Sequence, residues 1–169
     1  ELLERFDVKA LAPLVEASSA APPRSARAPA PRDEASTAEI ALKVGSKEYR
    51  SSGPAECRAA AQASIYGIAA AQYSVSQRSG NESLRLTLWQ PKDGSPSMLS
   101  LHVSSGGSRY EVDTVKGGAK RDIKGSGKAS LQNSGAGGVF MIDARAASGE
   151  AIAGKIACSR FGAIQAEGG

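Results

Sequence analysis

The chain has 169 residues, enough for one ordinary domain and a tail, and its formal net charge is +4. Aromatic residues make up 5% of it and there are 19 glycines, which is typical of a small β domain and not of a helix-rich cytosolic enzyme. No stretch approaches the roughly 20 apolar residues of a membrane-spanning helix. Because the chain begins with Glu1 and not Met, we expect a processed or trimmed product, and whether an export signal or anchor preceded it stays open.

Residues 1–17 have the apolar pattern of an amphipathic helix. The positions that recur at spacings of three and four are Leu3, Phe6, Ala10 and Leu14. Pro13 should end or kink this helix near its last turn. A helix this short needs a surface to lie on, which can be its own domain, a membrane or another protein. We therefore predict an N-terminal docking helix.

Residues 18–38 form a predicted linker that is rich in proline and alanine. Five of the eight prolines lie between Pro13 and Pro31, a composition that favours an extended, semi-rigid tether. Two uses of such a tether stay open. It can carry a docking helix away from the domain, or it can be the membrane-proximal stalk of an exported protein.

Residues 39–165 are predicted to form the folded domain, and residues 166–169 a short tail. Apolar residues alternate with polar ones in several short runs separated by glycine-containing turns. The segment 54–72 is ambiguous because its alanines suit a helix, but we favour strands with Gly67 at a bend or bulge. About eight strands without an intervening helix predict an all-β antiparallel sandwich or barrel.

The two cysteines, Cys57 and Cys158, lie near the start and the end of the predicted domain. Two thiols and the single His102 cannot complete a four-ligand structural zinc site, and there is no Cys-x-x-Cys redox pair. A disulfide closing a loop of about 100 residues would suit an exported domain with a modest core. Two separate buried thiols are the alternative.

A basic segment is the most distinctive local feature of the domain. From residue 39 onward there are 16 basic and 11 acidic side chains, and the basic ones gather in a predicted loop at Lys116, Lys120, Arg121, Lys124 and Lys128. Flexible cations of this kind can contact a polyanion. The loop has no aromatic residue for base stacking, so specific nucleic-acid binding is not expected. An ordinary solvated loop is the alternative.

The sequence shows no catalytic signature. There is no Gly-x-Ser-x-Gly motif, and Asp113, Asp122 and Asp143 are scattered acids without a second signal. His102 is out of phase with the alternating Leu99, Leu101 and Val103, so it should lie on the opposite sheet face. We expect no enzyme activity, no cofactor and no metal.

Several short motifs resemble the mycobacterial nineteen-kilodalton lipoprotein antigen family. They are Val-Gly-Ser-Lys at 44–47, Glu-Cys at 56–57, Ser-Gly-Lys-Ala at 126–129, Phe-Met-Ile-Asp at 140–143 and Ile-Ala-Cys-Ser at 156–159. The resemblance covers most of residues 40–160. It implies a non-enzymatic cell-surface lipoprotein whose small β domain follows a low-complexity tether, with an early cysteine paired to one in the last strand. The chain lacks the family's lipid-bearing N-terminal cysteine.

The segment 104–110 is similar to the Ser-Gly-x-x-Tyr loop of periplasmic C-type lysozyme inhibitors, which are also small disulfide-tied β-barrels. That resemblance implies that Ser105 and Tyr110, with a basic residue such as Lys116 or Lys120, would enter a lysozyme cleft.

From these features we predict a periplasmic, cell-surface or otherwise extracytoplasmic domain that acts by binding. The leading hypothesis is an accessory subunit that docks on a larger protein assembly or a membrane through its N-terminal segment. A hydrolase inhibitor acting through the 104–110 loop is the alternative.

Overall fold

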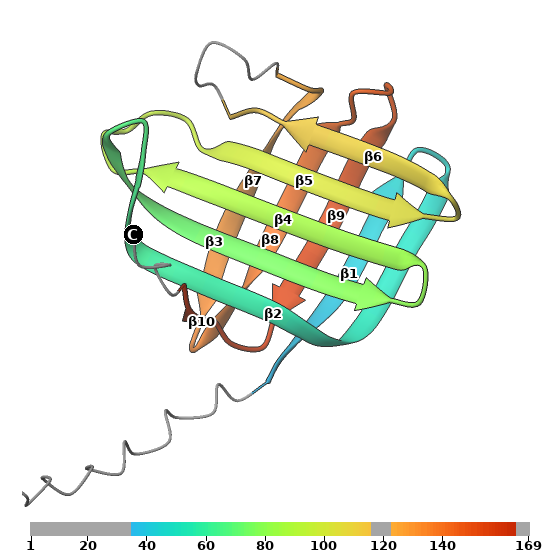
Figure 1. Ribbon diagram of the computed structural model, residues 1–169, viewed down its shortest axis with the longest axis horizontal. Coiled ribbons are helices and arrows are strands. Elements are labelled where there is room, and N and C mark those ends of the chain that lie inside the picture. The colour runs from blue at the N-terminus through green and yellow to red at the C-terminus, as the bar shows by residue number, and fades with distance from the viewer. Residues whose placement is uncertain (1–34, 116–122, 165–169) are drawn as a thin grey trace, which may run out of the picture. The chain divides into compact units, whose positions relative to one another are not determined.

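The computed structural model of the protein describes residues 35–115 and 123–164, which form an all-β domain (Figure 1). Its ten strands are β1 (Ser36–Val44), β2 (Lys47–Ile65), β3 (Ile68–Ser79), β4 (Glu82–Pro91), β5 (Met98–Ser105), β6 (Ser108–Asp113), β7 (Ser126–Ser134), β8 (Gly137–Arg145), β9 (Ala151–Cys158) and β10 (Gly162–Ala163). The predicted all-β fold is confirmed, with more strands than the sequence pattern indicated. No helix in this part of the chain is long and apolar enough to cross a membrane.

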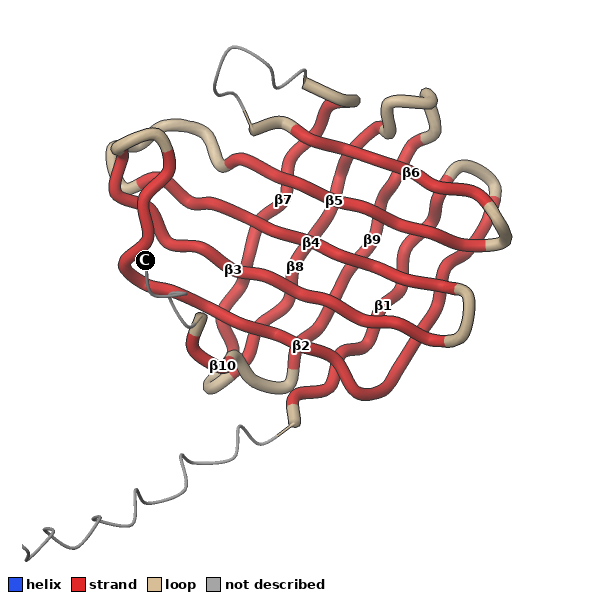
Figure 2. The backbone as a smooth tube through the Cα atoms, in the orientation of Figure 1, coloured by secondary structure: helices blue, strands red, loops and turns tan. Residues whose placement is uncertain are grey.

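Nine of the strands form one antiparallel sheet that curls into a nearly closed barrel. The order is β6-β5-β4-β3-β2-β1-β9-β8-β7, so the first strand lies beside the ninth. In Figure 2, β3–β6 form one layer and cross the strands of the other layer, β1 and β7–β9, at a steep angle. The two layers are joined through β2, which pairs with β1 along its first half and with β3 along its second. Gly53, at φ 150°, lies where β2 passes from one layer to the other, a bend that glycine allows.

Backbone hydrogen bonds connect β6 at two points, once to the segment before β7 and once to the turn between β8 and β9. Asp113 and Lys124 exchange two backbone hydrogen bonds of 2.7 and 3.0 Å, and the N–H of Ala147 donates to the carbonyl oxygen of Glu111 at 2.9 Å. These bonds satisfy backbone groups on the edge of β6, which would otherwise be free to pair with another chain.

The core fills the space between the layers with the apolar residues that alternate along each strand. Leu84, Leu86 and Leu88 of β4 are almost completely buried, as are Phe140, Ile152 and Ile156 of the other layer. The ring of Phe140 makes edge contacts with the rings of Tyr73 and Phe161, with centroids 6.5 and 5.9 Å apart. Burial of this kind supplies most of the stabilisation of a small domain.

The disulfide is present, and it joins the two layers. Cys57 on β2 and Cys158 at the end of β9 have an S–S distance of 2.00 Å and a Cα–Cα distance of 6.2 Å. Both residues are buried, and the N–H of Cys57 donates to the Oγ of Ser36 at 3.0 Å. The link therefore ties the second strand to the ninth inside the core.

Two details of the expected layout differ in the structure. Gly67 lies in the turn between β2 and β3, and the irregular register of β2 falls earlier, between Ala60 and Ala63. β1 begins at Ser36, inside the range 18–38 assigned to the linker. The helix predicted over 1–17, the rest of that linker and the tail at 166–169 lie outside the described residues.

Candidate functional site

The basic residues singled out from the sequence do not form one loop in the described part of the chain. Lys128 lies on β7, on the outer face of the sheet opposite Asp143. Lys124 lies at the seam between β6 and β7, where its Nζ donates to Glu111 at 2.8 Å. Lys116, Lys120 and Arg121 are outside the described residues, as are the docking positions Leu3, Phe6, Ala10 and Leu14.

The two residues assigned to an inhibitory loop are not available together. Tyr110 points into the core and is only 8% exposed, because it has the same phase on β6 as the buried Val112. Ser105 lies at the end of β5, and its Oγ donates to Oε1 of Glu82 at 2.7 Å. For Tyr110 to enter a partner's cleft, as the resemblance implies, its ring would have to leave the core first.

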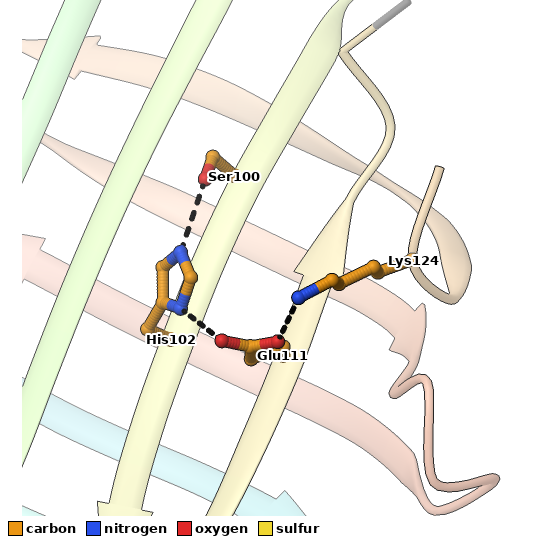
Figure 3. Close-up of polar contacts among 4 residues, drawn as sticks. All are labelled: Ser100, His102, Glu111 and Lys124. Atoms are coloured by element: carbon orange, nitrogen blue, oxygen red, sulfur yellow. Dashed lines mark hydrogen bonds and ion pairs between the residues drawn. The ribbon is translucent and has the colours of Figure 1, made fainter. Parts of the chain in front are cut away.

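A polar cluster lies on the outer face of the β3–β6 layer (Figure 3). His102 pairs across the strands with Glu111, and its Nδ1 is 3.4 Å from Oε1 of that carboxylate. Its Nε2 is 3.4 Å from the Oγ of Ser100, which lies two residues along the same strand face. Lys124 completes the cluster through the other oxygen of Glu111. The predicted placement of His102 on the face opposite the leucines is confirmed.

The electrostatics of this cluster centre on Glu111. Its hydrogen bond with Lys124 and the positive charge of that ammonium lower the pKa of the carboxyl from its usual 4.5, with smaller contributions from His102 and Arg109. The carboxylate is partly buried and is shared between a cation and an imidazole. Because it already has two partners, it helps to hold the seam closed beside β6.

The order serine, histidine, carboxylate has the residue types of a hydrolytic triad, but the arrangement lacks the other parts of such a site. The serine and the histidine lie on an open strand face, and neither is among the residues that line the hollows over this face at Arg78–Arg109 and at Arg109–Ser148. The N–H groups of a central strand belong to the sheet ladder, so they cannot stabilise an oxyanion. We interpret the cluster as a connection between β5, β6 and the segment before β7.

A row of four residues crosses the same outer face near the β3–β4 and β5–β6 turns. Arg78 pairs with Ser83, Ser83 with Ser104, and Ser104 with Arg109, so each end carries an arginine and the middle two hydroxyls. We call these four residues the arginine–serine row. In the adjacent row Arg85 lies two residues along β4 from Ser83. In the described residues none of the three arginines has an ion-pair partner within 4.0 Å.

This row is part of a shallow hollow of about 380 Å³. Its lining includes all four residues of the row, the turn residues Gly80, Asn81 and Gly107, and Glu82 and Ser108. The alternation of inward and outward side chains along β3, β4 and β6 is enough to place the three arginines on outer faces. Their convergence depends on the strand order and register, which the sequence pattern did not provide.

A second hollow lies on the opposite outer face, over β2, β1, β9 and β8. It has a volume of about 500 Å³, and its lining includes Ala41, Ala157, Val139, Arg50 and Lys155. Arg50 and Lys155 lie on either side of Ala41 in the register, Glu39 lies in the adjacent row, and Arg50 is already bonded to Glu48 at 2.9 Å. This surface therefore has a weaker excess of unpaired positive charge than the arginine–serine row.

No cluster of three or more potential metal-ligating side chains occurs within residues 35–115 and 123–164. Comparison of the chain with protein-family models, with curated proteins and with solved structures gives no match. The functional interpretation therefore depends on the geometry of the domain itself.

Proposed function

We propose that this protein is a non-catalytic, exported binding or accessory subunit. The observation that carries the proposal is the division of side chains between the two sides of the sheet. Apolar residues fill the interior between the layers, and the unpaired arginines lie on an outer face beside a shallow hollow. A domain built in this way offers a partner an exposed, charged surface.

The disulfide supports an extracytoplasmic location. A buried sulfur–sulfur link between strands at opposite ends of the sequence forms and persists where the environment is oxidising. The periplasm, the cell surface and the extracellular space all meet that condition.

We further propose that the N-terminal segment docks the subunit on a larger protein assembly or on a membrane surface. The support comes from the sequence, where the apolar stripe Leu3, Phe6, Ala10 and Leu14 precedes a proline-rich tether. The tether would leave the β domain free to contact a second partner.

The test compares the full chain with a variant lacking residues 1–20, both expressed in the native host with an intact export route. Association with envelope membranes is measured by flotation. The deletion should abolish association, and circular dichroism with thiol titration should show that the domain stays folded and oxidised. A full chain in which Arg5 and Lys9 are replaced by serine is the matched control and should still associate. Unchanged association of the shortened, folded chain would refute the docking role.

A further inference from the structure

The arginine–serine row brings cationic and hydroxyl groups to one place on an outer face. Neighbouring antiparallel strands are about 4.8 Å apart, so the Cα atoms of Arg78 and Arg109 are separated by about 14 Å across three strand spacings. Ser83 and Ser104 lie side by side between them. Extended arginine side chains from the two ends, and that of Arg85 from the next row, can therefore meet over the two hydroxyls.

The acidic groups of this face are already engaged. Glu111 shares its carboxylate between Lys124 and His102, and Glu82 accepts a hydrogen bond from Ser105. The lining of the hollow therefore combines two arginines with one carboxylate, and Arg85 adds a third positive charge in the adjacent row, outside that lining. A guanidinium group presents several N–H donors in a plane and binds oxyanions through paired hydrogen bonds.

The hydroxyl groups add a second requirement for the ligand. The Oγ atoms of Ser83 and Ser104 make no hydrogen bond with another described residue, and each can donate one hydrogen bond. A tetrahedral oxyanion has enough acceptor oxygens for two guanidinium groups and two hydroxyls at once. The open shape of the hollow also admits a group that is attached to a long chain.

We propose that the arginine–serine row is a binding site for phosphate or sulfate groups carried by an extended polyanion. Ser83 and Ser104 donate to the oxyanion from the sheet surface, Arg78 and Arg109 hold it from the two sides, and Arg85 contacts the next anionic group along the chain. The proposal names the partner class of the binding function inferred above and therefore depends on it.

The test uses the full chain with four probes at constant ionic strength. Inorganic phosphate and sulfate are titrated against the amide resonances of the protein, and polyphosphate and heparin are titrated by calorimetry. The largest amide shifts should fall at Ser83, Ser104 and their neighbours. Polyphosphate binding without heparin binding identifies a phosphate-bearing partner, the reverse identifies a sulfate-bearing one, and either result supports the site. Shifts elsewhere, or no binding of any probe, would overturn it.

Matched variants separate a defined site from general charge attraction. Arg78→Ser with Arg109→Ser should weaken polyanion binding by about tenfold or more and make it less sensitive to salt. Lys43→Ser with Lys155→Ser removes the same charge from the opposite outer face and should leave affinity within about twofold. Equal losses in the two pairs would overturn the proposal.

A conservative pair gives a further check. Arg78→Lys with Arg109→Lys keeps the charge but removes the paired donors, so affinity should fall between that of the wild type and that of the serine pair. Unfolding midpoints equal to that of the wild type would show that the variants are folded. A chain that binds the polyanions but no longer needs residues 1–20 for membrane association would refute the docking role alone, so the two proposals fail separately.

Discussion

Removal of the disulfide should cost this domain a large part of its stability. Cys57 and Cys158 are 101 residues apart in the sequence, so the link restricts nearly the whole folded domain in the unfolded state. The chain-entropy relation assigns a loop of about 100 residues about 4.7 kcal/mol at 25 °C. Small domains are stable by only about 5–15 kcal/mol, so the loss should move the protein close to its unfolding threshold.

The assay is urea unfolding of the wild type and of a chain carrying Cys57→Ala and Cys158→Ala, followed by circular dichroism. We expect the free energy of unfolding to fall by about 4–5 kcal/mol. The stability of the double variant should be the same with and without a reducing agent, which is the control for effects of the agent itself. A loss below about 1 kcal/mol would refute the reasoning, because the unfolded chain would then already be restricted by other contacts.

Three further perturbations test other parts of the structure. Gly154→Ala should destabilise the domain by about 2 kcal/mol or more in thermal unfolding. An added Cβ would lie 2.1 Å from the backbone oxygen of Ala41, and the φ of Gly154 is +146°. A neutral result would contradict the close packing of β1 on β9. Glu111 has a lowered pKa, so its stabilising contribution is present above pH 4.5 and is lost as the pH falls through the lowered pKa. The unfolding midpoint of Glu111→Gln should therefore change less over that pH range than the midpoint of the wild type. Parallel curves of midpoint against pH for the two proteins would count against the Lys124 contact. Tyr49→Phe should be neutral or slightly stabilising in chemical unfolding, because the buried hydroxyl has no hydrogen-bond partner in the described part of the chain, and a loss above about 1 kcal/mol would reveal one.

The alternation of apolar residues was sufficient to predict most strands and their inward faces. Leu99, Leu101 and Val103 are buried and His102 lies on the opposite face, as period-two patterning requires. The disulfide also followed from the count and the position of the two cysteines. These features depend on local pattern and on composition, which the sequence contains directly.

Features that depend on how distant strands pair could not be predicted in the same way. The length of β2 and its passage between the two layers were hidden by an alanine-rich segment that also suits a helix. Lys124 was grouped with a basic loop that could contact a polyanion, but the strand order places it beside Glu111. The parallel pairing of β10 with β2 has no sequence signal, since Gly162 and Ala163 are too short a run to show periodicity.

The position of β1 has a consequence for the biogenesis of the protein. Because this first strand lies between β2 and the ninth strand, the sheet cannot complete its hydrogen bonding until residues near 158 have emerged from the ribosome or a translocation pore. Pairings over such distances in the sequence form slowly, because the entropy of closing the loop is lost before the contacts are gained. The barrel therefore closes only after β9 is available to pair with β1.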